Sequence, residues 1–301
     1  MKLYRFFKSS ICNITEDVKQ KEYYILSDEE RISLQHCLIS IYQDVIRVCE
    51  KYNLVCMLSG GSALGAVRHK GFIPWDDDMD LMMPRKDYNK LIEIFNEEMQ
   101  EDYELSSPNS SRPNYFVQII KKGTTVRYSN DSHDSGIEID IFPIDVVPRS
   151  ILLRYFLHYI CIICRGIRYS IRTYKNKEIS LKNVLSRNKS SYFLYLCLNS
   201  IGFLFHWIPE RYWCIWCDKA ASIGGTSKFS TIAMGRNLYM KETLHTDVFF
   251  PSSQGVFEGM KVNLPNNVDK YLSNLYGNYM EIPPENKREY HAITKFSINN
   301  K

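Results

Sequence analysis

The sequence has no internal repeat, no low-complexity tract and no strong excess of either charge. Its 301 residues carry a formal net charge of +4, with 45% hydrophobic and 24% charged residues. These proportions are typical of an ordinary globular protein and exclude a disordered tail. A chain of this length can bury one large core or two small ones.

The sequence also lacks the marks of a secreted, disulfide-bonded protein. The opening stretch MKLYRFFKSSICNITEDVKQ contains no long apolar core of a signal peptide, and the nine cysteines are odd in number and scattered. We therefore expect a cytoplasmic protein. Two Cys-x-x-Cys pairs, Cys161/Cys164 and Cys214/Cys217, have the spacing of zinc ligands, but their apolar, helix-like surroundings favour a role as small core residues.

Acidic residues are nearly absent from one part of the chain. Residues 149–189 contain ten Lys or Arg and a single acid, Glu178, and residues 190–209 contain no charged residue. Two interpretations remain open: an amphipathic segment lying in an anionic membrane surface, or a helical hairpin packed on the core, with a membrane span through 190–209 less favoured than either. For the first, we expect a peripheral protein on the inner face of the membrane, held less well when Arg165, Arg168 and Arg172 are changed to Glu.

Helical and strand periodicities alternate along the remainder of the chain. Ser27 and Glu30 form a capping-box pattern at the start of a helix, and Pro143 is expected to end a strand. The expected elements are a helix at 27–52, a strand at 54–58, a short helix at 62–68, a strand at 78–82, a helix at 85–100, strands at 115–121, 124–128 and 136–142, mostly helix over 149–222, a strand in FEGMKVNLP and a closing helix in NNVDKYLSNLYG.

Four carboxylates crowd a short stretch, WDDDMD, at the start of one predicted strand. Asp76, Asp77, Asp78 and Asp80 repel one another, so a cation is expected among them. Asp78 and Asp80 leave the same face of the strand about 7 Å apart, and Asp140 on a later strand is a third candidate. This oxygen-rich set predicts a site for Mg²⁺ or Mn²⁺, whereas a solvated acidic loop or a calcium site is the alternative.

A glycine pair precedes the short helix that leads to these acids. Backbone N–H groups at a helix N-terminus bind phosphate oxygens, and glycine allows a close approach. Gly60, Gly61 and Ser62 are therefore candidate substrate-binding residues, although such a stretch is also a common plain turn.

Three residues between the glycines and the acids are further candidates for substrate binding. Arg68 and Lys70 are expected to contact phosphate, or else to be ordinary surface charges. Trp75 has the chemistry to stack on a base or face a choline cation, with ordinary packing as the alternative.

The order of these motifs is that of nucleotidyltransferase-fold enzymes: a strand, Gly-Gly-Ser, a helix, a strand with Asp-x-Asp and a later strand with one more Asp. More specifically, the stretches LSGGSALGAVRHKGFIPWDDDMDLMMPRKDY, IDIFPID and FEGMKVNLPNNVDKYLSNLYGNYMEIPPENKREYH resemble the LicD family of phosphocholine and phospho-alditol transferases, which are kin to fukutin and fukutin-related protein. The similarity covers about residues 57–145 and 257–291, and residues 149–222 show no family motif.

The resemblance implies an α+β fold with a nucleotidyltransferase-like mixed β-sheet flanked by helices, formed by a single domain over residues 1–301 with a helical basic and apolar insertion at 149–222. It also implies that Asp78, Asp80 and Asp140 are the metal-binding, catalytic acids, and that Arg288 and His291 belong to the closing motif.

The activity implied by the resemblance is transfer of a phospho-substituent from a CDP-linked donor to a sugar hydroxyl of a cell-surface glycan, free or lipid-linked. No nucleic-acid partner is expected. The alternatives are a nucleotidyltransferase that moves a nucleoside monophosphate and a non-catalytic, membrane-associated assembly factor. The donor substituent, the acceptor glycan and the oligomeric state stay open.

Overall fold

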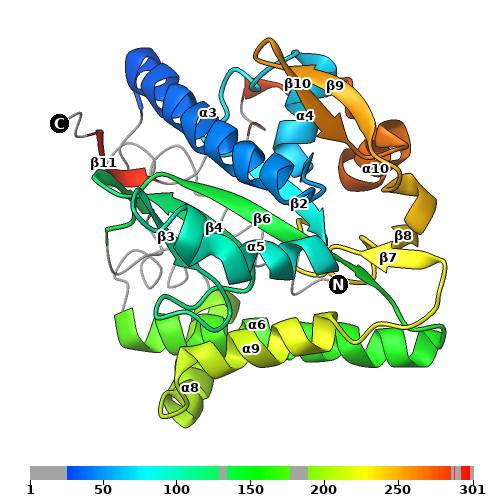
Figure 1. Cartoon of the computed structure of the whole chain (residues 1–301). Helices are drawn as coiled ribbons and strands as arrows, with labels where there is room; N and C mark the ends of the chain where they lie inside the picture. Colours follow the sequence, from blue (N-terminus) through cyan, green and yellow to red (C-terminus); the bar gives the residue numbers. More distant parts are fainter. Residues whose placement is uncertain (1–25, 129–133, 177–188, 286–287, 289–292, 299–301) are drawn as a thin grey trace.

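A mixed β-sheet forms the centre of the molecule (Figure 1). The computed structural model describes residues 26–128, 134–176, 189–285, 288 and 293–298. Within them, seven strands join in the order β1-β2-β6-β4-β3, with β7 beside β6 and β8 beside β7; only β2 and β6 pair in parallel. The bounds are β1 Met57–Leu58, β2 Asp80–Pro84, β3 Tyr103–Ser106, β4 Val117–Lys121, β6 Glu138–Val146, β7 Phe229–Thr231 and β8 Leu244–His245.

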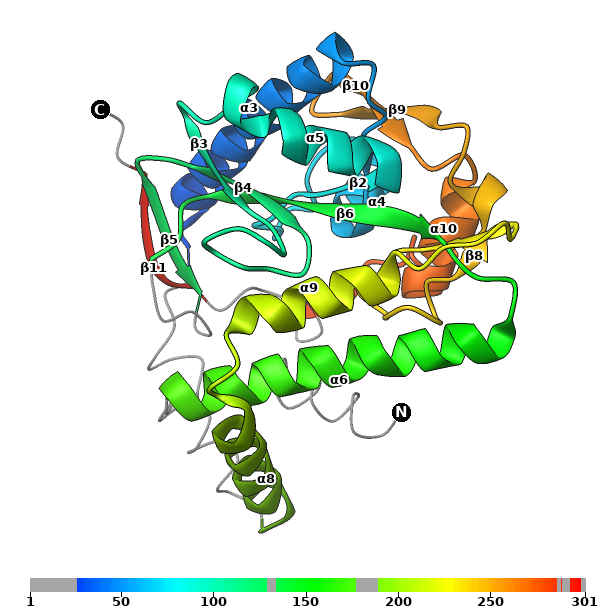
Figure 2. The ribbon, with the colours of Figure 1, turned by 60° about the horizontal axis from the view of Figure 1, so that its bottom comes forward.

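Helices cover both sides of this sheet. The helices are α3 Asp28–Lys51, α4 Gly60–Arg68, α5 Arg85–Glu98, α6 Ile151–Asn176, α8 Lys189–Phe205, α9 Glu210–Ala221 and α10 Val268–Tyr276, with a short 3₁₀ turn, η1, at Thr246–Val248. In Figure 2, α3 and α5 lie on one side of the sheet, and α9 and α6 lie on the other. The predicted α+β class, with helices flanking a mixed sheet, is confirmed.

Two small antiparallel pairs complete the described fold. They are β9 Ser253–Phe257 with β10 Met260–Leu264, and β5 Thr124–Tyr128 with β11 Ile293–Ile298. The predicted capping box is present at the start of α3, where the Ser27 hydroxyl accepts the N–H of Glu30 and the Glu30 carboxylate accepts the N–H of Ser27. This reciprocal pair satisfies two N–H groups at the helix start.

The central strand β6 continues past Pro143 to Val146, so the prediction that Pro143 ends the strand is wrong. The N–H of Asp140 donates to Met79 O on the β2 side, and alternate residues of β6 therefore turn their N–H groups toward β2. The nitrogen of Pro143 faces the opposite side of β6. On that side, pairing with β4 ends at Ile141 and pairing with β7 begins at Asp145, so Pro143 lies between the two paired stretches. The missing N–H costs no ladder bond there.

The helical segment 149–222 contains α6, α8 and α9, and its inner face is anchored by a row of buried side chains on α6. Leu157, Cys161, Cys164 and Ile171 recur at three- and four-residue spacing and are all nearly inaccessible. The Cys217 thiol on α9 lies 3.7 Å from the carbonyl oxygen of Cys161. The predicted role of the two Cys-x-x-Cys pairs as small core residues agrees with this burial.

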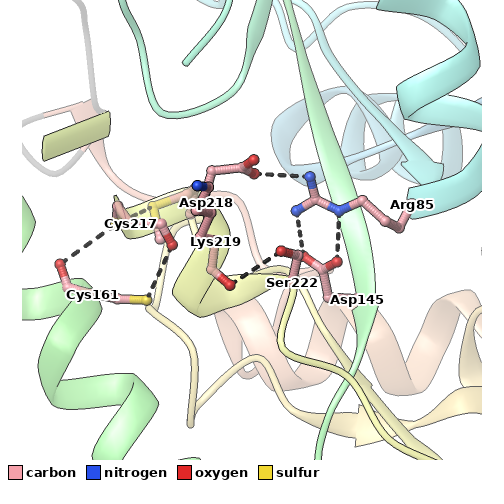
Figure 3. A network of polar contacts seen from close by, with 8 residues as sticks. Arg85, Asp145, Cys161, Cys217, Asp218, Lys219 and Ser222 are labelled. Atoms are coloured by element: carbon pink, nitrogen blue, oxygen red, sulfur yellow. Dashed lines mark hydrogen bonds and ion pairs between the residues drawn. The ribbon is translucent and has the colours of Figure 1, made fainter. Parts of the chain in front are cut away.

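An ion-pair network fastens α9 to the sheet and to α5 (Figure 3). The guanidinium of Arg85 donates two hydrogen bonds of 2.7 Å to the buried Asp145 of β6 and one of 2.8 Å to Asp218 of α9. Burial raises the pKa of Asp145 above its ordinary value, against the opposing effect of the Arg85 charge. Burial also disfavours the charged form of Arg85, but its bonds to Asp145 and Asp218 outweigh this and raise its pKa.

A second set of ion pairs occupies part of the basic run. Arg168 is 4% exposed and donates to the Pro113 carbonyl oxygen at 2.7 Å and to Glu210 at 3.3 Å, while Arg172 donates to Glu210 at 3.0 Å. Arg168 therefore serves the fold, and the prediction that it acts at a membrane surface is wrong.

The apolar stretch 190–209 forms most of α8 and the turn that follows it. Among the described residues, no single helix has the length and apolar character needed to cross a bilayer. The segments Tyr192–Phe205 and Glu210–Ala221 meet that requirement only as a pair, which is bent by 98°.

Candidate functional site

The candidate site begins at the N-terminus of α4. The sequence predicts that the glycine pair precedes this helix, but Gly60 and Gly61 are its first two residues. The first helical hydrogen bond runs from the N–H of Ala63 to Ser59 O at 2.9 Å. The Tyr271 hydroxyl, from α10, accepts the N–H of Gly60 at 3.1 Å and lies 3.0 Å from the Ser59 hydroxyl. The N–H of Gly60 is thus already bonded within the protein, and the next two N–H groups of the helix are those of Gly61 and Ser62.

Both glycines lie against carboxylates. Gly60 has a φ of +46°, and a Cβ at this position would lie 2.6 Å from Asp80 Oδ2; a Cβ at Gly61 would lie 3.2 Å from Asp76 Oδ2. The Ser62 hydroxyl accepts the N–H of Asp80 at 2.9 Å, so it fixes the start of β2 against α4. The glycines therefore allow negative groups to approach a helix N-terminus, whose dipole favours them.

The HKGFIPW loop turns back along α4 and brings the acids to its start. A Cβ at Gly65, one turn into the helix, would lie 2.4 Å from the carbonyl oxygen of Gly71. The loop is held by Glu258, whose carboxylate accepts the N–H of Phe72 at 3.0 Å, and by Gln35, which donates to the Asp76 carbonyl oxygen at 3.0 Å. The long separation between the glycines and the acids is thus compatible with their contact.

Three consecutive acids lie close enough to share a cation. Carboxylate oxygens of Asp76, Asp77 and Asp78 all lie within 4.8 Å of one another, and Asp77 is 7% exposed. In the part of the chain that the structure describes, no other group of three His, Cys, Asp or Glu residues meets this distance. Asp78 and Asp80, but not Asp76 and Asp77, are predicted as ligands from the sequence, although all four belong to the same acidic stretch, WDDDMD.

Asp80 and Asp140 lie side by side in the sheet. They are paired Cα partners on the parallel strands β2 and β6, and Gln118 of β4 is the next residue in the same row. The Gln118 side-chain amide donates to Asp140 Oδ1 at 3.0 Å and to Glu138 Oε1 at 2.8 Å. The Asp78, Asp80 and Asp140 set stays a prediction: Asp78 is grouped with its two sequence neighbours, and Asp80 with Asp140.

Tyr276, at the end of α10, closes the site from a distant part of the chain. Its hydroxyl lies 3.7 Å from the point where a Gly60 Cβ would stand, and the Arg236 guanidinium lies 4.8 Å from its ring centroid. Burial raises the pKa of Tyr276 well above its usual value; Arg236 opposes this, and the Asp80 and Asp76 carboxylates add to it. Tyr271, Tyr276 and Arg236 are not predicted from the sequence as site residues, although both tyrosines lie in the NNVDKYLSNLYG stretch that carries the family resemblance.

The two predicted phosphate-binding cations have different surroundings. Arg68 is the last residue of α4, and its pKa is lowered mainly by burial, with the charge of Asp76 acting in the opposite direction. Its Nη1 donates to the Tyr279 carbonyl oxygen at 2.8 Å, and its Nε donates to His69 Nε2 at 3.0 Å. Lys70 is exposed beyond the far end of α4, in the left-handed conformation, and its carbonyl oxygen accepts the N–H of Glu258. This position favours the surface-charge interpretation of Lys70.

Trp75 is already in contact with a cation. The Arg288 guanidinium lies 4.2 Å from its ring centroid, and the His69 ring meets it edge-on at 6.5 Å between centroids. These contacts favour the packing interpretation of Trp75 over stacking on a substrate. They also give Arg288 of the closing motif a contact at the site, whereas His291 of the same motif lies outside the described residues.

Comparison with known proteins agrees with the resemblance. Residues 53–157 match the family described as LicD/FKTN/FKRP, nucleotidyltransferase domain. The lipopolysaccharide cholinephosphotransferase LicD of Haemophilus influenzae is 28% identical over 260 residues, which cover 83% of this chain and 91% of that protein. The resemblance to the LicD family is confirmed.

Two shorter matches are to uncharacterized proteins of Rickettsia. The protein from Rickettsia prowazekii is 38% identical over 92 residues, which cover 28% of this chain and 34% of that protein. The protein from Rickettsia typhi is 29% identical over 92 residues, covering 31% of this chain and 28% of that protein.

Proposed function

We propose that this chain, whose residues 53–157 match the LicD/FKTN/FKRP nucleotidyltransferase domain, is a transferase that moves phosphocholine or a similar phospho-substituent from a CDP-linked donor to a sugar hydroxyl of a cell-surface glycan such as lipopolysaccharide. The similarity to the Haemophilus influenzae LicD, over most of both chains, carries this proposal. The grouping of acids around the N-terminus of α4 supports it, because a helix N-terminus beside carboxylates suits a diphosphate that is bound together with a divalent cation.

The donor diphosphate would lie at the N-terminus of α4. The N–H groups of Gly61 and Ser62 would donate to its oxygens, and Arg68 would add positive charge along the same helix. The carboxylates of Asp76 and Asp80 lie at this end as well. A bare diphosphate would be repelled by them, so the proposal requires a divalent cation between the two.

The donor set fits Mg²⁺ or Mn²⁺. Asp76, Asp77 and Asp78 bring carboxylate oxygens within 4.8 Å of one another, and these are the hard ligands that such ions prefer. We propose that Asp78 and Asp80 hold the ion, with Asp76 and Asp77 supplying the additional negative charge. When bound, it would neutralise the diphosphate and stabilise the charge on the departing CMP.

Asp140 has one of two roles in the proposed reaction. It either joins the metal ligands or accepts the proton of the attacking sugar hydroxyl, as the new oxygen–phosphorus bond forms and the bond to CMP breaks. Gln118 positions it in either case, because its amide donates to Asp140 Oδ1. Tyr276 would keep its proton at neutral pH and act as a hydrogen-bond donor beside Asp80.

Product analysis tests the proposal and its main alternative. The purified protein would be incubated with a panel of CDP-linked donors (choline, ribitol and glycerol), a sugar acceptor and Mg²⁺. Release of CMP with a phosphorylated acceptor would support the proposed transfer. Release of pyrophosphate from CTP and a phosphorylated substrate would instead support nucleotidyl transfer. The absence of both products with every donor would favour a non-catalytic assembly factor.

A further inference from the structure

Helix α6 has apolar side chains on two opposite faces. Its inner row packs in the core, whereas Leu152, Phe156, Tyr159 and Ile163 form an outer row at three- and four-residue spacing and are 78%, 61%, 59% and 56% exposed. A surface helix of an ordinary globular domain carries polar residues on its outer face. This outer row is therefore an apolar surface without a partner inside the described part of the chain.

Helix α8 lies on the same outer side of α6. Ser170 continues the row of Leu152, Phe156 and Ile163 along α6, and α8 approaches so closely there that a Cβ at Gly202 would lie 2.2 Å from the Ser170 carbonyl oxygen. Leu204 at the end of α8 and Trp207 in the following turn are 62% and 72% exposed. In Figure 2, α8 extends away from the body of the molecule.

The charges of this segment favour an anionic partner. Glu210 and Asp218 are the acids among the described residues of 149–222, and both are held in ion pairs with arginines. Arg149 and Lys175 are exposed cations near the two ends of α6, and Lys175 also lies 3.9 Å from Glu210. The surface that surrounds the apolar rows therefore has an excess of positive charge.

We propose that Leu152, Phe156, Tyr159, Ile163, Leu204 and Trp207 form a lipid-docking face, which lies in the plane of a membrane containing anionic lipids. Apolar and aromatic side chains flanked by Lys and Arg are the composition of helices that bind such surfaces. A second copy of this chain would supply the same positive charge and be repelled, so an anionic lipid surface is the better match. The inference does not depend on the transfer reaction.

Flotation with lipid vesicles tests this face. The full-length protein should float with phosphatidylcholine vesicles that contain phosphatidylglycerol, and less with phosphatidylcholine alone or at high salt. Changing Phe156 and Ile163 together to Glu should lower the bound fraction about tenfold, because two apolar groups that would insert into the lipid are lost and negative charge is added. Changing Arg149 and Lys175 to Gln should weaken binding only to the anionic vesicles.

Matched controls separate docking from folding. Ile32 on α3 is 51% exposed on the other side of the sheet, so Ile32→Glu should leave flotation unchanged. Circular dichroism would check each variant, and Leu152→Glu at the most exposed position is the second test if the double variant fails to fold. Activity on a soluble acceptor should stay unchanged in all folded variants, so a failure of docking and a failure of the proposed transfer are distinguishable.

Three outcomes would overturn the proposal. The first is no flotation of the unmodified protein with either kind of vesicle. The second is a dimer in light scattering that becomes a monomer in the double variant without any vesicle binding, which would make the face a contact between copies. The third is resistance to salt and alkaline washing, which would indicate a membrane span.

Discussion

Asp80 and Asp140 are directly opposite each other on the parallel strands β2 and β6, so their side chains leave the same face of the sheet. Neighbouring strands lie about 4.8 Å apart, which is close enough for both carboxylates to act on one substrate or ion. The Gln118 amide fixes one side of this pair, and Gly60 allows the N-terminus of α4 to approach the other. The pair thus joins the sheet to the proposed phosphate site.

The first prediction concerns the acids. Asp78→Asn, Asp80→Asn and Asp140→Asn should each lower the rate of transfer about a hundredfold or more, because each removes a charge that binds the cation or accepts a proton. The melting temperature without metal should be unchanged or higher, since repulsion among the carboxylates is reduced. Glu104→Gln, at an exposed position of β3, is the matched control. Near-normal turnover in any of the three variants would refute its assignment.

The sequence places Asp140 on a strand, because the alternation of GIEIDIFPID is clear, and it places Asp80 on another. That these two strands are parallel neighbours with Asp80 opposite Asp140 depends on the order of the strands and is seen only in the structure. The sequence does not predict Tyr276 or Arg236, which reach the site only through the packing of α10 and a loop far along the chain. The period-two pattern of GIEIDIFPID also could not reveal that Pro143 turns its nitrogen away from β2, which depends on the order of the strands.

The second prediction concerns Gly60. Gly60→Ala should reduce transfer strongly, because its Cβ would stand 2.6 Å from Asp80 Oδ2 and displace that carboxylate. The backbone strain at positive φ should cost about 1 kcal/mol of stability. Gly123→Ala is the control: Gly123 has a φ of +76° with no atom within 4 Å of its would-be Cβ. Similar losses of stability in both variants with equal, normal activity would show that Gly60 is only a turn residue.

The third prediction separates two tyrosines of α10. Tyr276→Phe should lower the rate of transfer about 10- to 100-fold with little loss of stability, because it removes a donor beside Asp80. Tyr271→Phe should instead lower the free energy of unfolding by about 1–3 kcal/mol, because the N–H of Gly60 and the Ser59 hydroxyl lose their partner. Steady-state kinetics and urea unfolding would measure the two effects. Equal effects of both variants on stability, with no difference in rate, would contradict this division of roles.

The fourth prediction concerns the network that fastens α9 to the sheet. Arg85→Met should lower the free energy of unfolding by about 3–5 kcal/mol, because Asp145 would be left buried without a partner. Asp218→Asn should cost only about 1 kcal/mol, since its side chain is 26% exposed and the Arg85–Asp145 pair remains. Urea unfolding measures both. An Arg85→Met variant as stable as Asp218→Asn would mean that the Asp145 carboxylate is not held in its charged form by Arg85.

The last prediction is a pH dependence at His69. Burial, with the Arg68 charge added, holds the pKa of His69 below its ordinary value of 6.5, and Nε2 of the neutral ring accepts a hydrogen bond from Arg68. The unfolded chain therefore takes up a proton at a higher pH than the folded chain does. The contribution of His69 to stability is complete above pH 6.5 and is lost as the pH falls through the lower, folded-state pKa.

His69→Gln isolates this contribution. The Gln side-chain oxygen can still accept from Arg68 but cannot titrate, so the variant should lose less stability than the unmodified protein when the pH falls below 6.5. Protonation of His69 would also break its bond with Arg68. Transfer by the unmodified protein should therefore decline in the same pH range, and transfer by the variant should decline less. Urea unfolding and initial rates measured across that range, with His36→Gln at an exposed position of α3 as the control, would measure both effects. Parallel pH profiles for the unmodified protein and His69→Gln would mean that Arg68 is positioned by its bonds to the Tyr279 and Glu281 carbonyl oxygens alone.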